Sequence, residues 1–337
     1  MLRISTIVPA YNCAAYLERA VDSLRATGYP DLEIVIVDDG STDGTWDVAR
    51  RLAATHAGRV LACCHPSRAN RGVSATRNLG IAQSRGELIA LLDADDYVYP
   101  NRFESAVRIL SEHSDVDGVY QTCEVAFADE TAEQRWFKDA PLFGFTEAIA
   151  PAQLLPRLLT GMCWATSAIL FRRSILERTG LFHPRLSIAE DCHLWMRMAC
   201  AGTLVAGDLS RPVSVYWRRN DSAYQPSPCR RLQMIRAMAS FLRWLRRRDP
   251  NDDRLAAATR CVEDYILGAI IAARSHGECR VAWSVALTAF LCFPRVALRR
   301  QFAGNLARMV ALRGTSQSLS PICGRGDTCR GAGGEGG

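Results

Sequence analysis

Residues 88–92 constrain the fold of this chain more than any other stretch. They form an uninterrupted apolar run, and three carboxylates follow directly at Asp93, Asp95 and Asp96. A run of this kind is typical of a strand buried on both faces, as in a parallel sheet. Such a strand delivers the residues after it to the carboxyl edge of the sheet, where open α/β sheets bind ligands. Because three carboxylates held there repel one another unless a cation lies among them, the stretch predicts a metal and nucleotide-diphosphate site.

Strand-like and helix-like segments alternate before and after this stretch. Apolar or β-branched runs at 4–8, 32–37 and 60–63 are separated by segments with helical spacing, such as 14–26 and 73–84. Alternation in units of roughly 25 to 30 residues predicts a right-handed, mostly parallel sheet. Later strands are expected to finish the same sheet, at 116–126, 166–171, 204–206 and 213–217.

The pattern changes at residue 226, where helix-length segments without strand signals begin. Residues 230–313 carry 16 arginines against 6 acidic residues, a local charge of +10 in a chain of net charge +6. These helices can pack back on the domain, pair with a second subunit as a homodimer, or touch a membrane surface; a solvated basic face is the simplest interpretation of the charge. The glycine-rich stretch after residue 313 predicts disorder. The expected organisation is an α/β domain at 1–225, a helical appendage at 226–313 and a disordered tail at 314–337.

Composition excludes several classes of protein. The 337 residues are 48% hydrophobic and 23% charged, as in ordinary globular proteins. No secretory leader is apparent and no apolar run reaches the ~18 residues that span a bilayer, so a cytoplasmic protein is predicted, with peripheral contact at the inner face of the membrane as an alternative. The 13 cysteines are scattered without a Cys-x-x-Cys pair, which favours reduced thiols over a zinc site. No nucleic-acid partner is expected.

Four loops should converge on the carboxyl edge of the sheet because each follows a predicted strand or leads into the next helix. They start at Pro9, Asp38, Asn70 and Asp93. Together they offer an aromatic ring, a carboxylate that can accept from a base N–H, an arginine for phosphate and a carboxylate pair. Mg²⁺ and Mn²⁺ favour oxygen ligands and typically share one or two carboxylates with substrate phosphates. Alternation at an extended strand end would place both acids of the Asp-x-Asp pair on the same side.

In this order and spacing the loop motifs resemble the signatures of family 2 glycosyltransferases of the GT-A fold, over about residues 3–220. Each motif is weak alone, and the ordered set is what makes the resemblance specific. It implies a Rossmann-like nucleotide-diphospho-sugar transferase fold. The motifs are Ile7-Val8-Pro9-Ala10-Tyr11-Asn12, Val37-Asp38-Asp39-Gly40-Ser41-Thr42-Asp43-Gly44-Thr45, Gly72-Val73-Ser74-Ala75-Thr76-Arg77-Asn78 and Leu92-Asp93-Ala94-Asp95-Asp96.

The resemblance also implies roles at a donor site and a metal site. It implies a nucleoside pocket, a hydrogen bond to the base, contacts to the ribose and diphosphate, and one ligand for Mn²⁺ or Mg²⁺. The residues in these roles would be Pro9, Ala10 and Tyr11 in the nucleoside pocket, Asp39 at the base, Arg77 at the base or diphosphate, Asp93 at the ribose and Asp95 at the ion.

A second carboxylate site is needed for the acceptor. Glu190 and Asp191 are similar to the family's Glu-Asp motif at a helix start, although a capping pair would explain them equally well in isolation. Within the family, Asp191 would be the catalytic base and Glu190 would support it. Trp164 and a flap at 136–145 would cover the acceptor, with packing as an equal explanation. Asn220 stands where the family usually has a histidine, which leaves the neighbouring arginines, Arg218 and Arg219, as phosphate contacts or surface residues.

The expected activity is an inverting, metal-dependent transfer of one sugar to a hydroxyl of a saccharide, lipid-linked or other acceptor, in surface polysaccharide or other glycoconjugate synthesis. Without Gln-x-x-Arg-Trp, the mark of processive synthases, single addition is favoured. One alternative is a sugar nucleotidyltransferase, which should carry a glycine-rich basic loop after the first strand, where this chain has Pro9-Ala10-Tyr11-Asn12-Cys13. A nicotinamide dehydrogenase would need Gly-x-Gly-x-x-Gly there. The last alternative is a non-catalytic sugar-nucleotide-binding protein of the same fold, against which Asp95 and Asp191 argue.

Overall fold

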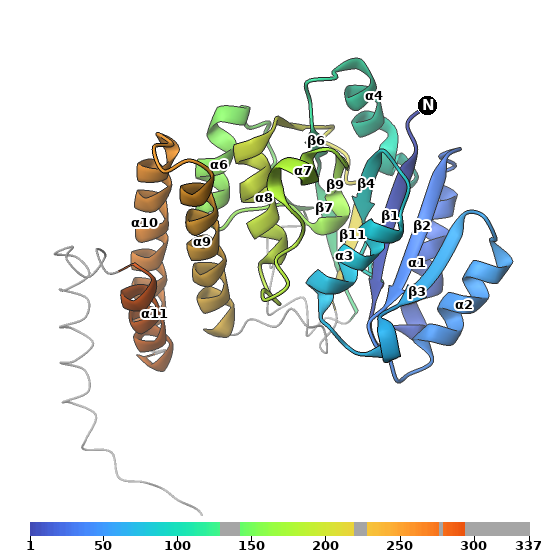
Figure 1. The fold of residues 1–337 in the computed structure, drawn as a ribbon, viewed down its shortest axis with the longest axis horizontal. Coiled ribbons are helices and arrows are strands. Elements are labelled where there is room, and N and C mark those ends of the chain that lie inside the picture. The colour runs from blue at the N-terminus through green and yellow to red at the C-terminus, as the bar shows by residue number, and fades with distance from the viewer. Residues whose placement is uncertain (129–141, 219–227, 276–278, 294–337) are drawn as a thin grey trace, which may run out of the picture.

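A seven-stranded sheet lies at the centre of the part of the chain that the computed structural model describes, residues 1–128, 142–218, 228–275 and 279–293. Its strand order is β10-β6-β9-β4-β1-β2-β3 (Figure 1). Strands β4, β1, β2 and β3 are parallel, whereas β9 runs antiparallel to both of its neighbours, β4 and β6. The mostly parallel α/β sheet predicted from the sequence is confirmed. The strands are β1 (Ile4–Ala10), β2 (Leu32–Asp38), β3 (Val60–Cys64), β4 (Leu88–Leu91), β6 (Gly118–Tyr120), β9 (Ile169–Arg172) and β10 (Leu204–Ala206).

A second, four-stranded sheet has the order β5-β11-β7-β8. It consists of β5 (Tyr97–Val98), β7 (Cys123–Phe127), β8 (Leu142–Phe143) and β11 (Ser214–Arg218). The prediction that 116–126 and 213–217 complete the main sheet was therefore wrong in part. The first segment divides into β6 and β7, because the carbonyl of Thr122 already accepts from Val213 N at 3.0 Å and turns the chain toward the second sheet.

The two faces of the main sheet are covered by different helices because successive side chains of a strand point to opposite faces. Ile4 and Val8 pack with α1 (Ala14–Ala26), α2 (Thr45–Thr55) and α4 (Glu104–Glu112). Ile7 and Leu91 belong to the core of the other face. That face is covered by α3 (Val73–Gln83), α6 (Pro151–Leu159), α7 (Ile175–Thr179) and α8 (Glu190–Ala201), and three short 3₁₀ turns, η1 (Pro66–Arg68), η2 (Pro100–Phe103) and η3 (Thr166–Ala168), complete the connections.

Strand β1 continues through Pro9, two residues further than the sequence suggested. Pro9 pairs with Val37 of β2, whereas β4 ends at Leu91, opposite Ile7. A proline inside a central strand normally removes a ladder hydrogen bond. Here the missing N–H costs little because β1 has run past the end of β4 on that side.

The C-terminal helices pack back on the α/β domain, which is one of the three arrangements considered for this segment. Helix α9 (Pro228–Arg248) lies against α8, and α10 (Arg254–Ser275) lies against α9 and α6, with α11 (Cys279–Cys292) completing the layer (Figure 1). Side chains such as Met238 and Phe241 share one hydrophobic core with α8. The expected boundary at residue 225, the tail at 314–337 and most of the flap at 136–145 lie outside the described residues.

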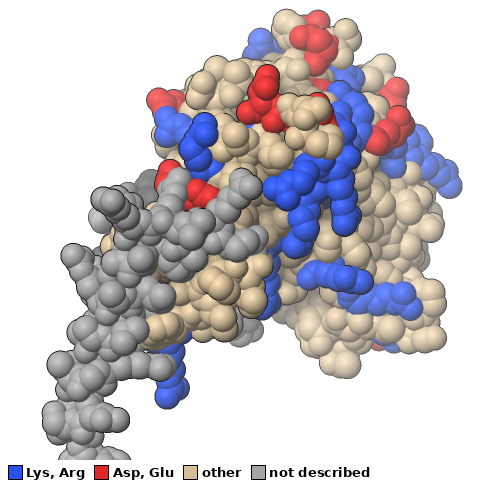
Figure 2. All heavy atoms as spheres, turned by 60° about the vertical axis from the view of Figure 1, so that its left-hand side comes forward, with Lys and Arg blue, Asp and Glu red and all other residues tan. Residues whose placement is uncertain are grey.

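The exposed side of α9 is basic, whereas α11 exposes apolar side chains such as Leu287, Phe290 and Leu291. In the view that brings these helices forward, Lys and Arg side chains gather near the middle of the surface (Figure 2). On α9 the exposed arginines are Arg236, Arg243, Arg246, Arg247 and Arg248. Within the described ranges, no helix combines the length and the hydropathy needed to cross a membrane.

Candidate active site

The carboxyl ends of three neighbouring strands bring the predicted loops together. Ala10 pairs with Asp38 across β1 and β2, and Asp39 N donates to the Ala10 carbonyl at 2.8 Å. Leu92 N donates to the Ile7 carbonyl at 3.0 Å, so β4 ends beside the same edge. Convergence of the loops that begin at Pro9, Asp38 and Asp93 is therefore a consequence of parallel register.

The first two loops are fastened to each other at Asn12. Its amide oxygen accepts from Thr42 N at 2.9 Å, and its own N–H donates to Ser41 Oγ at 3.0 Å. Asn12 has a φ of 49°, a left-handed conformation that asparagine tolerates better than most residues. The neighbouring Tyr11 is 53% exposed, which leaves its ring available to a ligand, whereas Ala10 is buried in the core and Pro9 is half-buried.

The Asp39 carboxylate holds the loop that leads into α3. One oxygen accepts from Arg71 N at 2.7 Å and the other from Gly72 N at 3.0 Å. Gly72 is the residue that precedes α3, so Asp39 fixes where that helix begins. A carboxylate has about four lone-pair sites, so this one still has capacity to accept from a ligand N–H.

The acidic residues after β4 form a tight turn, in which Asp96 N donates to the Asp93 carbonyl at 3.0 Å. Strand alternation therefore does not continue to Asp95, and the argument that an extended strand end puts Asp93 and Asp95 on one side was wrong. Asp93 is held from two directions, by Arg77 at 2.7 Å and by the Thr166 hydroxyl at 3.1 Å. The side chain of Asp95 is half-exposed.

Asp96 had no role in the sequence interpretation, and the structure gives it one. Its carboxylate is buried and accepts from Trp217 N at 2.8 Å, which joins this turn to β11 of the second sheet. Burial, followed by the negative charges of Asp95 and Asp93, raises the pKa of Asp96 well above its ordinary value. The only sequence signal for a role of Asp96 was its position as a third acidic residue, directly after the Asp-x-Asp pair. Arg218 on the same strand is also buried, which excludes the surface-residue alternative for it, whereas Arg219 and Asn220 lie outside the described residues.

Arg77 connects the two halves of the site. Its guanidinium is 3% exposed and donates to Asp93 at 2.7 Å and to Glu190 at 2.6 Å, while it lies over the ring of Phe182. Burial alone would lower the pKa of Arg77, but the charges of Asp93 and Glu190 outweigh it and raise the pKa. Sequence reasoning assigned Arg77 to the base or diphosphate; the geometry instead shows it bridging the end of β4 and the start of α8.

Asp191 lies in the first turn of α8 and is half-exposed, next to the buried Glu190. Burial, with the charge of Asp191 second, raises the pKa of Glu190. The residue before this pair, Ala189, has a φ of 60°, a strained conformation for alanine that costs about 1–2 kcal/mol. The chain therefore enters α8 through a left-handed residue that directly precedes the two carboxylates.

Trp164 does not line this site. It is fully buried and stacks on Tyr120 with ring centroids 4.7 Å apart, and on Trp195 at 5.8 Å. The acceptor contact considered for Trp164 is therefore contradicted, and packing, its alternative, is what the geometry shows.

The pattern of a known family matches residues 5–180, more than half of the chain; the family is described as glycosyl transferase family 2. The chain belongs to this family. The resemblance seen in the loop motifs is thus confirmed.

Curated relatives match part of the length of this chain. An uncharacterized glycosyltransferase of Nostoc sp. is 35% identical over 187 residues, which is 54% of this chain and 55% of that protein. Chondroitin synthase of Pasteurella multocida is 35% identical over 119 residues, 35% of this chain and 12% of that protein. The chain spans between 55% and 58% of the length of the first curated relatives that it matches.

Solved structures show the GT-A fold over nearly the whole of this chain. S. aureus TarS residues 1–349 in complex with UDP-GlcNAc has a TM-score of 0.67 at 17% identity, covering 96% of this chain and 95% of that one. The mannosyltransferase PcManGT from Pyrobaculum calidifontis, in complex with GDP-Man and Mn²⁺, has a TM-score of 0.50 at 20% identity, covering 94% and 88%. At these identities the likeness concerns the fold alone. The TarS match includes the C-terminal helices, so the α9–α11 layer belongs to the shared architecture.

The acidic turn after β4 fits a hard divalent cation. Asp93, Asp95 and Asp96 offer carboxylate oxygens within one turn, the ligand type that Mg²⁺ and Mn²⁺ prefer. Burial is the main cause of the raised pKa of Asp96, and an excess of negative charge from Asp95 and Asp93 is the second cause. A cation at the half-exposed Asp95 would relieve that excess.

Proposed function

We propose that this glycosyltransferase moves one sugar from a nucleotide-diphospho-sugar to an acceptor hydroxyl by a single, inverting displacement assisted by a divalent cation. The observation that carries the proposal is the Arg77 bridge, with donor atoms 2.7 Å from Asp93 and 2.6 Å from Glu190. One guanidinium thereby joins the acidic turn expected at the donor to the carboxylates expected at the acceptor. Fold relatives with bound UDP-GlcNAc or GDP-Man support the donor class.

At the donor, the exposed ring of Tyr11 stacks on the base, and Pro9 and Ala10 form the wall behind it. Asp39 accepts from a base N–H with the lone pairs that the amides of the α3 loop leave open. Asp93 accepts from the ribose hydroxyls, in an orientation fixed by Arg77 and Thr166. The base is uracil or another that presents an N–H to Asp39.

Asp95 is the residue that would hold Mn²⁺ or Mg²⁺. When bound, the ion supplies neutralisation of the negative charge that develops on the departing nucleoside diphosphate. The buried Arg218 lies within electrostatic reach of the same acidic turn, since its positive charge opposes the rise in the pKa of Asp96. It is the described arginine that we assign to the diphosphate side.

Asp191 acts as the base that takes the proton from the acceptor hydroxyl as it attacks the anomeric carbon. The N-terminus of α8 favours a carboxylate there through the helix dipole. Glu190 supports it indirectly, because the ion pair with Arg77 offsets the second negative charge of the Glu-Asp pair. One side-chain base matches a single displacement, which inverts the anomeric configuration.

The acceptor is proposed to be a saccharide, a lipid-linked sugar or another hydroxyl compound of a surface polysaccharide or glycoconjugate pathway. The partial match to chondroitin synthase supports a saccharide acceptor. The exposed arginines of α9 suit an anionic acceptor surface such as lipid headgroups. Membership of the family removes the reason to favour a nucleotidyltransferase.

The decisive experiment measures nucleoside diphosphate release from a panel of UDP- and GDP-sugars with Mn²⁺ or Mg²⁺ and a mixture of hydroxyl acceptors. Asp191→Asn should lower transfer by roughly 10²–10⁴-fold, the usual contribution of a positioned base, while nucleotide still raises the melting temperature. Asp115→Asn, at an exposed acid away from the site, is the matched control and should keep full activity.

Three outcomes would contradict parts of the proposal. Full activity in Asp191→Asn would remove the base. Transfer that is unchanged by chelation and by Asp95→Asn would remove the ion. Nucleotide-sugar binding without turnover for every donor and acceptor would favour a non-catalytic binding protein instead.

A further inference from the structure

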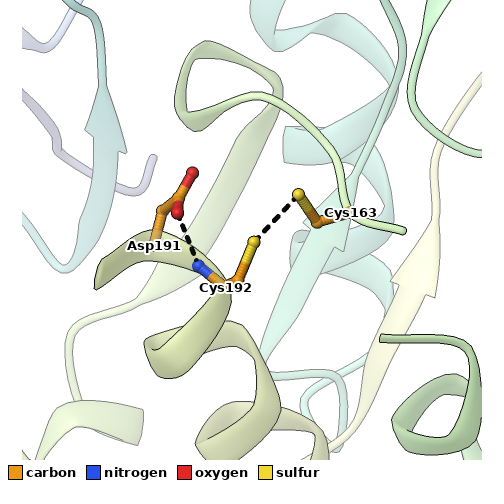
Figure 3. Close-up of side chains that lie close together, drawn as sticks. All are labelled: Cys163, Asp191 and Cys192. Atoms are coloured by element: carbon orange, nitrogen blue, oxygen red, sulfur yellow. Dashed lines mark hydrogen bonds between the residues drawn. The ribbon is translucent and has the colours of Figure 1, made fainter. Parts of the chain in front are cut away.

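Two cysteines that are far apart in the sequence meet beside Asp191. Cys163 precedes η3 and Cys192 lies in the first turn of α8, yet their sulfur atoms are 3.0 Å apart (Figure 3). The two thiol sulfurs and a carboxylate oxygen of Asp191 all lie within 4.8 Å of one another. Among the described residues this is the group of His, Cys and acidic side chains whose spacing suits a metal ion.

Carboxylates surround the two thiols of this cluster. Asp191 accepts from Cys192 N at 2.7 Å, and Glu190 precedes both residues in the same helical turn. The hydrogen bond with Cys163 and burial raise the pKa of the Cys192 thiol, and the Asp191 charge adds to the effect.

We propose that Cys163, Cys192 and Asp191 form a site for a soft divalent cation of the zinc class, separate from the ion at Asp95. Binding replaces two S–H bonds by two metal–sulfur bonds and releases two protons to solvent, while the carboxylate supplies an oxygen ligand and water completes a four-coordinate shell. Asp191 and Cys163 are half-exposed, which gives the ion and its water an entry path.

Geometry favours a metal over a disulfide at this position. Two sulfurs at about 2.3 Å from a tetrahedral zinc lie about 3.7 Å apart, so the thiols would separate by roughly 0.7 Å. A disulfide would require them to approach to about 2.05 Å and to adopt a restricted dihedral angle. The adjacent carboxylate also has a function in a metal shell and none in a disulfide.

Occupancy of this site inhibits transfer, an effect that rests on the proposed function of Asp191. A carboxylate bound to zinc cannot accept the acceptor's proton. Mg²⁺ and Mn²⁺ do not compete well for this site because they favour all-oxygen ligand sets. The glycosyltransferase would therefore be activated by a hard cation at one carboxylate and inhibited by a soft cation at another.

The binding test uses the full-length, reduced, metal-free protein titrated with Co²⁺ and Cd²⁺. The wild type should develop a thiolate-to-metal charge-transfer band. The amplitude of this band should fall by the equivalent of one bound metal ion in Cys163→Ser and in Cys192→Ser. Cys200→Ser is the matched control, because Cys200 lies on α8 about 12 Å further along the helix. Equal bands in all four proteins would overturn the site, as would the loss of two titratable thiols without any band, which indicates a disulfide.

The activity test adds Zn²⁺ to transfer assays at saturating Mg²⁺. Cys163→Ser should need more than about tenfold more Zn²⁺ for half-inhibition, since loss of even an outer-shell partner costs about 10–100-fold in metal affinity. Cys200→Ser should match the wild type. A band that depends on Cys163 in a protein without transferase activity keeps the site and removes the proposed function. Zinc inhibition that is equal in Cys163→Ser keeps the function and removes the inhibitory role.

Discussion

Replacing Arg77 by methionine should destabilise the protein more than any exposed arginine replacement. The guanidinium is 3% exposed and makes two charge-assisted hydrogen bonds, at 2.7 Å to Asp93 and 2.6 Å to Glu190. Removing one partner of a buried ion pair typically costs about 3–5 kcal/mol, because the remaining charge stays buried without compensation. At roughly 2 °C per kcal/mol for a chain of this size, the melting temperature should fall by about 6–10 °C.

Thermal unfolding of Arg77→Met is compared with that of Arg50→Met. Arg50 makes an ion pair of similar length, 2.7 Å, with Asp47, but the two side chains are 62% and 73% exposed. Exposed helical pairs contribute about 0.3–0.5 kcal/mol, so this control should melt within about 1 °C of the wild type. Equal melting temperatures for the two variants would refute the argument that burial makes the Arg77 bridge strong.

Acidification should reduce the cost of Arg77→Met. Burial and the charge of Asp191 already raise the folded-state pKa of Glu190 above 4.5, and loss of Arg77 raises it further. A group whose folded pKa is raised binds its proton more tightly when folded, so the deficit is smallest below about pH 4.5 and grows as pH rises. If the single variant fails to fold, Arg77→Met with Glu190→Gln should be the more stable protein; a double variant that is worse would contradict the buried-charge explanation.

Three further substitutions should change stability or nucleotide binding in a defined direction. Gly80→Ala should cost about 1–3 kcal/mol in urea unfolding, because a Cβ there would lie 2.3 Å from Ile7 Cγ2 and over-pack the α3–β1 contact. Burial lowers the pKa of His193 to about 2, so between pH 6.5 and 2 the unfolded state takes up the proton and stability falls by about 1.4 kcal/mol per pH unit; His193→Leu should remove that slope. Asp39→Asn should weaken nucleotide binding by calorimetry and lower stability by about 1–3 kcal/mol, since an amide cannot accept both loop N–H groups on two oxygens.

The strand ends were predictable from sequence, and the direction of later strands was not. Apolar runs followed by Asp38 and Asp93 identify buried parallel strands because both faces must be apolar, and the register of β1 with β2 and β4 then brings their ends together. Strand β9 has a similar apolar run, yet it runs antiparallel between β4 and β6. Nothing local encodes that direction, because an apolar strand buried on both faces has the same composition either way.

Side-chain partners across long separations were also hidden from sequence reasoning. The signal for Arg77 was an arginine on the helix after a glycine-containing loop, which indicates a position near the edge but not the length of its reach. The contacts of Trp164 and Cys163 were likewise not predictable from the sequence. Trp164 was considered for the acceptor and lies in the core. Cys163 was only one of the scattered cysteines expected to be reduced thiols, and its sulfur lies 3.0 Å from that of Cys192.

Helix α3 aligns the donor half of the site with the acceptor half. Its residues Ser74, Arg77 and Asn78 share one face, because residues three and four apart on a helix are neighbours. Each bonds to the segment around α7 and α8: Ser74 Oγ to the Leu186 carbonyl at 2.8 Å, Asn78 to both main-chain groups of Phe182, and Arg77 to Glu190. The start of α3 is in turn held by Asp39. A substitution that shifts α3 would therefore move the proposed base relative to the nucleotide pocket. It would do so without replacing the base or any residue of the pocket.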